Sequence, residues 1–274
     1  MRSKNSSKIN IAEIFRQTFQ LLRENPTIIL LFLAIAVLDA VALAILFYAP
    51  SEPVSLIVGP IIRAFWSGQY LHYPANFVLL PKLMTHAHFL ILTFVGIVVT
   101  GVVVKKIESH VQGERLTTTS AVMPVMRKYF ALLAAWLLTF FCFKVVMGVV
   151  MPLVPARMVA VQLSVGFVVA LLLQSLMVFL IPSILISGKG FIKDVISGIA
   201  FGAKNIVNTS ILIAVPVLMI LLLSYVKALA PFLADTYPEG VLWILAFGIL
   251  ITMVVDLMIT SSTTILYLKA RNTK

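Results

Sequence analysis

Charge is the property that this sequence has least of. Only 11% of its 274 residues are Asp, Glu, Lys or Arg, whereas a soluble globular domain carries about 25%. Hydrophobic residues make up 61% of the chain. So few charged side chains cannot cover a surface that faces water, which excludes a soluble globular protein. The composition therefore predicts an all-α, polytopic membrane protein.

The residues and motifs of catalysis are scarce as well. Cys142 is the one cysteine, so no internal disulfide can form. The chain has no GxSxG, HExxH, CxxC or glycine-rich phosphate-loop pattern. His86 and His88 are two positions apart and point in different directions on a helix, so we interpret them as a polar helix boundary rather than a metal site. We expect no enzymatic activity, no metal and no other cofactor.

Six apolar segments are long enough to cross a bilayer, which takes roughly 20 residues of helix. They are predicted at about 27–48, 87–104, 130–153, 158–186, 209–231 and 241–268. The basic N-terminus lacks the short apolar core and cleavage site of a signal peptide, so we expect the first span to be retained. Residues 49–86 form an outer excursion, predicted to be interfacial, re-entrant or bound to a partner. The whole chain, 1–274, is expected to form one integral membrane domain.

Lys and Arg residues are distributed unequally between the predicted loops. The four segments of one side hold Arg2, Lys4, Lys8, Arg16, Arg23, Lys105, Lys106, Arg115, Arg127, Lys128, Lys189, Lys193, Lys204, Lys269, Arg271 and Lys274, and the other side holds only Arg63, Lys82 and Arg157. This asymmetry predicts that both termini are cytoplasmic, in a bacterial cytoplasmic (inner) membrane. The loops are too short for a compact basic face that would bind nucleic acid. We expect anionic lipid headgroups to bind at Lys105, Lys106, Arg127 and Lys128.

Amphipathic helices are predicted in the interface before spans 1, 3 and 5. The stretch "NIAEIFRQTFQLLREN" places apolar residues on one helical face, with Asn10 and Glu13 as a capping box, and predicts a helix over 10–24. The stretch "GFIKDVISGIAFGAKNIVN" repeats the pattern, and "TTTSAVMPVMRKYF" repeats it more weakly because Pro124 interrupts it. The chain therefore reads as three units of an interfacial helix followed by a transmembrane hairpin.

Three short stretches resemble a known membrane superfamily. They are an early "F..TF.LLR.NP", a mid-chain "IPSILISGKGFIKDVISGIAFGAKN" and a closing "T.ILYLKAR". With six spans, they look like the six-helix membrane domain attached to some glycerophosphodiester phosphodiesterases and like related bacterial inner-membrane proteins. Members often carry an acidic residue in the turn after the proline, where this chain reads "SGKG". The phosphodiesterase domain is not in this sequence, so the resemblance implies the fold and not that activity.

Three charged residues fall inside predicted spans: Asp39, Lys144 and Asp256. At 1.5 Å per residue, Asp39 lies about 18 Å, Asp256 about 17 Å and Lys144 about 21–22 Å from the cytoplasmic ends of their spans. Because an intramembrane charge is costly without a partner, these similar depths predict an ion pair or triad. Lys227 lies near the outer end of its span, where its side chain can snorkel.

Polar residues on the sixth span extend this network. Thr252, Thr260 and Thr263 share a helical face with Asp256, and Gln174 adds polarity midway along the fourth span. The face either lines a path for a proton, an ion or a lipid headgroup, or it is an internal network that fixes helix packing. We expect a non-catalytic accessory, scaffold or anchoring subunit with a protein partner in the membrane. The alternative is a transporter or lipid-handling permease that uses Asp39, Lys144 and Asp256.

Overall fold

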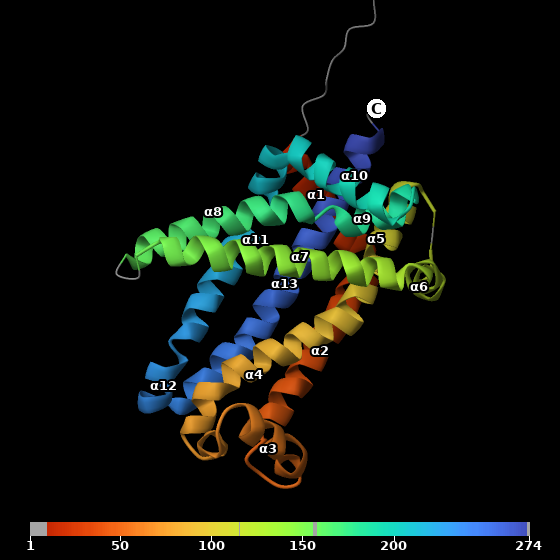
Figure 1. Ribbon diagram of the computed structural model, residues 1–274. Helices are drawn as coiled ribbons and strands as arrows, with labels where there is room; N and C mark the ends of the chain where they lie inside the picture. Colours follow the sequence, from red (N-terminus) through yellow and green to blue (C-terminus); the bar gives the residue numbers. More distant parts are fainter. Residues whose placement is uncertain (1–9, 115, 156–157, 273–274) are drawn as a thin grey trace, which may run out of the picture. The chain divides into compact units, whose positions relative to one another are not determined.

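The computed structural model describes residues 10–114, 116–155 and 158–272, and its regular elements are helices (Figure 1). Six helical stretches are long and apolar enough to cross a membrane: Pro26–Phe47, Ala75–Val111, Tyr129–Leu153, Ala160–Ser187, Ile206–Ala228 and Pro238–Arg271. The expected all-α, multi-pass membrane protein is thus confirmed. Six of the basic residues named above lie outside the described residues: Arg2, Lys4, Lys8, Arg115, Arg157 and Lys274.

The chain forms two compact units, and each unit is assembled from segments that are distant in sequence. The single integral membrane domain expected over 1–274 stays a prediction. Unit 1 comprises Met1–Ile29, Val98–Val217 and Leu257–Lys274, and unit 2 comprises Leu30–Ile97 and Leu218–Asp256. Four of the six long apolar stretches therefore contribute residues to both units.

Unit 1 contains the three helices that the sequence predicts before spans 1, 3 and 5. Its elements are α1 (Ile11–Glu24), most of α5 (Ile97–Val111), α6 (Thr118–Arg127), α7 (Tyr129–Val150), α8 (Val159–Met177), α9 (Leu180–Ser187), α10 (Phe191–Lys204), the first half of α11 (Ile206–Ala228) and the end of α13 (Pro238–Asn272). The Asn10 side chain caps α1 by accepting from the Ala12 N–H at 3.1 Å. The predicted helix over 10–24 is confirmed, and α7 and α8 lie side by side as a hairpin (Figure 1).

Helix α10 packs through glycine, while two of its isoleucines face outward. Gly198 and Gly202 are buried, whereas Ile192 and Ile196 are exposed. A Cβ at Gly202 would lie 2.6 Å from the Leu176 carbonyl oxygen, so only glycine lets α10 approach the backbone of α8 this closely. Part of the apolar face of this amphipathic helix is therefore exposed, and its place in the interface stays a prediction.

The turn between α9 and α10 is held by a buried carboxylate. Asp194, in the first turn of α10, accepts from the Ser187 hydroxyl and from the Lys189 N–H, the latter at 3.1 Å. Gly188 adopts the left-handed conformation (φ 63°) that ends a helix without strain. The carboxylate that stabilises the "SGKG" turn thus comes from the helix that follows it.

Two cations satisfy carbonyls at the C-terminal end of α9. Lys128 donates to the Ile184 oxygen at 2.6 Å, and Arg271 donates to the Ile186 oxygen at 3.1 Å. The last carbonyls of a helix have no partner within it, and the helix dipole favours a positive charge there. These bonds fasten the start of α7 and the end of α13 to α9.

Unit 2 is built around an apolar core and contains the outer excursion. Its elements are most of α2 (Pro26–Phe47), α3 (Val54–Phe65), the 3₁₀ turn η1 (Gly68–Leu71), α4 (Ala75–Ile91), the π-helical turn η2 (Leu92–Gly96), the second half of α11, α12 (Ala230–Thr236) and most of α13. Leu43, Phe77, Leu80, Ala234 and Leu245 pack in its core.

The second span begins at Ala75, twelve residues before the predicted start at 87. The excursion predicted over 49–86 is correspondingly shorter, because its last residues belong to α4. Pro81 and Lys82 interrupt the apolar run in the sequence, yet both lie inside the helix.

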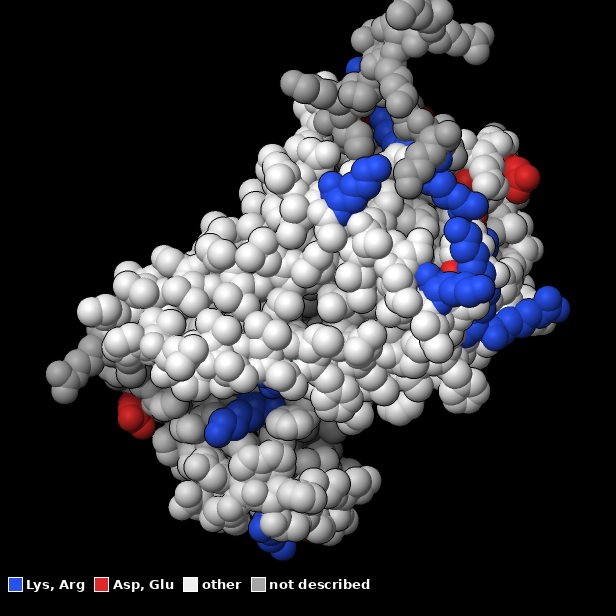
Figure 2. Space-filling view, turned by 45° about the horizontal axis from the view of Figure 1, so that its top comes forward, with Lys and Arg blue, Asp and Glu red and all other residues white. Residues whose placement is uncertain are grey.

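Basic residues divide unequally between the two units. Of the 15 Lys and Arg residues in the described part of the chain, 12 belong to unit 1 and 3 to unit 2, whereas each unit holds 5 of the acidic residues. Figure 2 shows most of the visible Lys and Arg side chains in one region, with separate basic side chains elsewhere and wide uncharged areas between them. A protein in a bilayer needs such uncharged surfaces where it meets hydrocarbon.

Candidate functional site

A polar cavity of about 200 Å³ lies in unit 2 among α2, α4, α11 and α13. Its polar side chains are Asp39, Thr85, His88, Ser224, Lys227 and Thr252. Its apolar wall includes Met84, Leu223, Leu245 and Ile249. At about 30 Å³ per water molecule, the volume suits roughly six waters or a small hydrated ion, and it is below the 300 Å³ or more of a typical ligand pocket.

Asp39 and His88 form a hydrogen-bonded pair on the cavity wall. The His88 Nδ1 lies 3.0 Å from Oδ1 and 2.9 Å from Oδ2 of Asp39. The Asp39 side chain is 4% exposed and the His88 side chain 27% exposed. At 1.5 Å per residue, Asp39 lies about 20 Å from the start of α2 and about 12 Å from its end. A carboxylate and an imidazole therefore share a proton site deep within a candidate span.

The pair of histidines at 86 and 88 is not a helix boundary, because both lie within α4. The His86 Nδ1 bonds to the Lys82 carbonyl oxygen at 2.7 Å, and its ring packs edge-on against Trp66. His88 instead faces Asp39. The two rings thus diverge, as their spacing predicts, and only His88 enters the site.

Lys227 brings a third charged group to the cavity. Its ammonium lies within the field of Asp39, and its stem passes close to α13 at Gly248. A Cβ at Gly248 would lie 3.4 Å from Cε of Lys227 and 3.1 Å from Cδ1 of Leu223. Glycine at this position therefore lets α11 approach α13 and admits the lysine stem to the wall.

Three hydroxyl groups complete the polar lining. Thr85 donates to the Pro81 oxygen at 2.7 Å, Ser224 to the Ile220 oxygen at 2.9 Å, and Thr252 to the Gly248 oxygen at 2.8 Å. Each proton is used within its own helix, which leaves oxygen lone pairs as acceptors. With Asp39, the hydroxyl oxygens can accept from water or hold a cation.

The remaining residues of the predicted network lie elsewhere. Asp256, partly buried, is the last residue of unit 2 and is not among the residues that line the cavity. Lys144 belongs to unit 1, where its Nζ lies 5.7 Å from the centre of the Phe140 ring, within the range of a cation–π interaction. The ion pair between Lys144 and the two aspartates stays a prediction.

The predicted polar face on the sixth span is divided between the units. Thr252 lines the cavity in unit 2, whereas Thr260 and Thr263 belong to unit 1. Thr263 is buried and donates to the Ile259 oxygen at 2.6 Å. Gln174, also in unit 1, is partly buried near the end of α8. Of the predicted face, Thr252 alone joins Asp39 at the cavity.

The four predicted headgroup residues differ in their surroundings. Lys105 pairs with Glu108 at 2.5 Å, Lys106 donates to the Thr118 hydroxyl at 3.3 Å, and Lys128 binds the end of α9. Arg127 is exposed. Three of the four thus stabilise unit 1 itself, so their part in lipid binding stays a prediction.

An open apolar groove of about 540 Å³ lies in unit 2 between α2 and α13. Ala36, Ala40 and Ala44 line it from α2, and Trp243 and Ala246 line it from α13. The small-residue stripe on α2 therefore leaves a space along the helix surface.

Comparison of the chain with protein-family models, with curated proteins and with solved structures found no match. The resemblance to the six-helix membrane domain stays a prediction. Within the described residues, no group of three or more His, Cys, Asp or Glu side chains could hold a metal ion.

Proposed function

We propose that this protein is a membrane transporter that moves protons, alone or with a small hydrated solute, by way of the Asp39–His88 pair in unit 2. The observation that supports this proposal is a hydrogen-bonded carboxylate and imidazole on the wall of a cavity, with the carboxylate midway along a candidate span. Histidine exchanges a proton more readily near neutral pH than any other side chain, and intramembrane ionisable residues mark proton and ion pathways.

The cavity suits a proton better than a large substrate. Its volume is about 200 Å³, and the Asp39 carboxylate and three hydroxyl oxygens can accept hydrogen bonds from a short chain of water. Lys227 adds a positive charge beside Asp39, which disfavours a second cation in the cavity. When a single proton passes between Asp39 and His88, the net charge of the pair does not change. The pair is either a carboxylate with an imidazolium or a carboxylic acid with a neutral imidazole.

The test is proton flux in liposomes that contain the purified protein and a pH-sensitive dye. A potassium gradient with valinomycin supplies the driving potential. Asp39→Asn keeps the shape of the side chain but cannot carry a proton, so we expect at least a tenfold loss of flux. Asp235→Asn is the matched control, because Asp235 is exposed on α12. Wild-type flux no higher than in empty liposomes, or full flux in Asp39→Asn, would refute the proposal.

A second candidate function is that of a subunit in a membrane complex, and the observation that favours it is the exposed apolar face of α3. Leu56, Ile57, Ile61 and Phe65 are exposed on this helix, which is too short to span a membrane. Purification in mild detergent tests it: a stoichiometric partner should accompany the wild type and be lost from Ile57→Ser. A partner retained by Ile57→Ser, or absent from the wild type, would count against the subunit role.

A further inference from the structure

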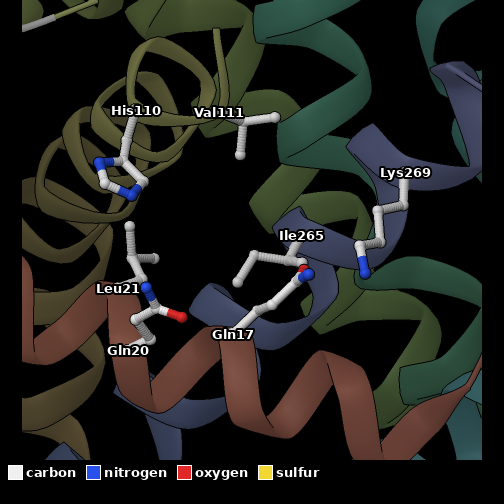
Figure 3. A pocket seen from close by; sticks show the side chains of 7 residues that line it. All are labelled: Gln17, Gln20, Leu21, His110, Val111, Ile265 and Lys269. Atoms are coloured by element: carbon white, nitrogen blue, oxygen red, sulfur yellow. The ribbon is translucent and has the colours of Figure 1, made fainter. Parts of the chain in front are cut away.

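Unit 1 contains a second pocket, of about 310 Å³, where α1 meets the ends of α5 and α13 (Figure 3). Gln17 and Gln20 line it from α1, His110 from α5 and Lys269 from α13, while Leu21 and Ile265 contribute apolar surface. The volume is within the range of small-molecule sites, about 300–1,000 Å³. None of these six residues belongs to the cavity in unit 2.

The two glutamines present their amide oxygens as acceptors. The Gln17 Nε2 donates to Glu13 and the Gln20 Nε2 donates to Glu24, each at 2.8 Å. Because an amide nitrogen bound in this way fixes the orientation of the group, its oxygen remains to accept a donor. Figure 3 shows the Gln20 amide oxygen on the side that faces the pocket.

His110 is held as a wall rather than as a ligand group. The Asn25 side-chain nitrogen, a donor, lies 3.3 Å from Nδ1 of His110, and Nε2 lies 3.4 Å from the Glu24 carboxylate. Because Asn25 donates to Nδ1, a neutral His110 ring carries its proton on Nε2, which faces Glu24. Both ring nitrogens are engaged by the protein itself.

The pocket is positive on one side and acceptor-rich on the other. Lys269 supplies the positive charge from α13. The hydrogen bond from Arg16 holds the pKa of Glu13 below its ordinary value, and the charges of Arg16 and Lys269 act in the same direction. Glu13 therefore stays ionised at neutral pH, and Glu24 stands beside Gln20. The acceptors and carboxylates would repel a simple anion, and Lys269 would repel a simple cation.

The location indicates that the ligand comes from the bilayer surface. The candidate span Ala75–Val111 ends at the pocket, and Pro238–Arg271 ends just beyond Lys269. The third wall is the amphipathic helix α1. Amphipathic helices lie in the interface at the level of lipid headgroups, so the wall that α1 provides favours a ligand from this layer.

We infer that this pocket binds the headgroup of a zwitterionic phospholipid that has a primary ammonium. Lys269 binds the phosphate, and the amide oxygens of Gln17 and Gln20 accept from the ammonium, with Glu24 adding negative charge on that side. The apolar surfaces of Leu21 and Ile265 lie against the glycerol region. The same chemistry would also hold the water-soluble ester glycerophosphoethanolamine, and the experiment below separates the two sources.

The experiment is a titration of the delipidated, detergent-purified protein, with thermal stability as the readout. The ligands are dihexanoyl phosphatidylethanolamine, dihexanoyl phosphatidylglycerol and glycerophosphoethanolamine. We expect the ethanolamine lipid to bind at least tenfold more tightly than the glycerol lipid. Lys269→Gln should weaken binding of both lipids at least tenfold, and Gln20→Leu should remove the preference between them. Lys204→Gln is the matched control, because Lys204 is exposed at the end of α10, away from the pocket.

Equal affinities for the two lipids, or unchanged binding by Lys269→Gln, would overturn the inference. If glycerophosphoethanolamine binds as tightly as the lipid, the headgroup chemistry is supported and the lipid source is overturned. Gln20 is exposed and Lys269 is partly exposed, so we expect both variants to fold, and circular dichroism of each checks this.

Discussion

Replacing Gly202 with alanine tests the packing of α10 on α8. The added Cβ would lie 2.6 Å from the Leu176 oxygen, 2.8 Å from the Ser175 oxygen and 2.9 Å from the Leu176 Cα. Ordinary contacts begin at 3.4 Å, so the closest atom is roughly 0.8 Å too near. All three atoms belong to the backbone of α8, which no rotamer change can move. The two helices must therefore separate.

The magnitude follows from two opposing effects. Overpacking of this kind costs about 1–3 kcal/mol, while alanine stabilises a helix interior by roughly 0.5–1 kcal/mol relative to glycine. The net expectation is a loss of about 1–2 kcal/mol in the free energy of unfolding, which lowers Tm by about 2–8 °C for a chain of this size.

The matched control is Gly148→Ala. Gly148 is also inside a helix, but a Cβ there would have no neighbour within 4 Å. This variant should keep the wild-type Tm or exceed it. Thermal unfolding of the two variants in the same detergent makes the comparison. A Tm for Gly202→Ala equal to or above that of Gly148→Ala would refute the reasoning from backbone contact.

Three further predictions concern buried or bound charges. His88→Leu removes the side chain that bonds to the buried Asp39 carboxylate and should cost about 3–5 kcal/mol, whereas Asp39→Asn should cost less than half as much, because a neutral imidazole can still donate to an amide oxygen. Thermal unfolding in detergent that gave the opposite order would contradict this. Asp194→Asn weakens two bonds to a charged acceptor and should lower the free energy of unfolding by about 1–3 kcal/mol, and an unchanged denaturation midpoint would count against a structural role for this carboxylate. Lys128→Met removes a cation from the end of a helix and should cost about 1 kcal/mol, while Arg127→Met, at an exposed neighbour, should have the stability of the wild type; equal losses in the two variants would contradict the bond to α9.

The class of fold and the location of most spans could be predicted from the sequence, because hydrophobic composition and cap residues act locally. Asn10 marks the start of α1. The start of α4 was misplaced for an equally local reason: Pro81, Lys82 and His86 lower the hydropathy of a segment that is nevertheless helical. Packing in unit 2 keeps these residues helical, and a window of sequence does not contain that packing.

The pairing of Asp39 with His88 depends on information that depth alone does not supply. Counting residues from the end of a span gives the height of a side chain but not the direction in which it points. Asp39, Lys144 and Asp256 have similar heights, yet the partner that Asp39 contacts in its own unit is His88. His88 lies 13 residues after the start of α4, well inside a continuous helix. Only a prediction that began this helix at Ala75 could have placed His88 within the span and proposed it as a partner of Asp39.

The close packing of α10 on α8 could also have been predicted from the sequence. Gly198 and Gly202 form a GxxxG pattern, a spacing that allows close helix contact in membranes. This pattern lies within a stretch interpreted as amphipathic, in which the isoleucines rather than the glycines were expected to make the packing contacts. Asp194 was obscured in the same way, since a charged residue in an amphipathic helix is expected to face water, and here it turns inward to hold a loop.

The π-helical turn at Leu92–Gly96 bears on how this chain tolerates changes in length. Its hydrogen bonds span one residue more than those of an α-helix. A chain one residue shorter there could close an ordinary α-helix without loss of helical hydrogen bonds. Because a π-helical turn takes one residue more than an α-helical turn to close, that deletion would leave His88 on nearly the same face of its helix. The five-residue turn at Leu92–Gly96 is therefore a place where the chain can lose one residue while the pairing of His88 with Asp39 is kept.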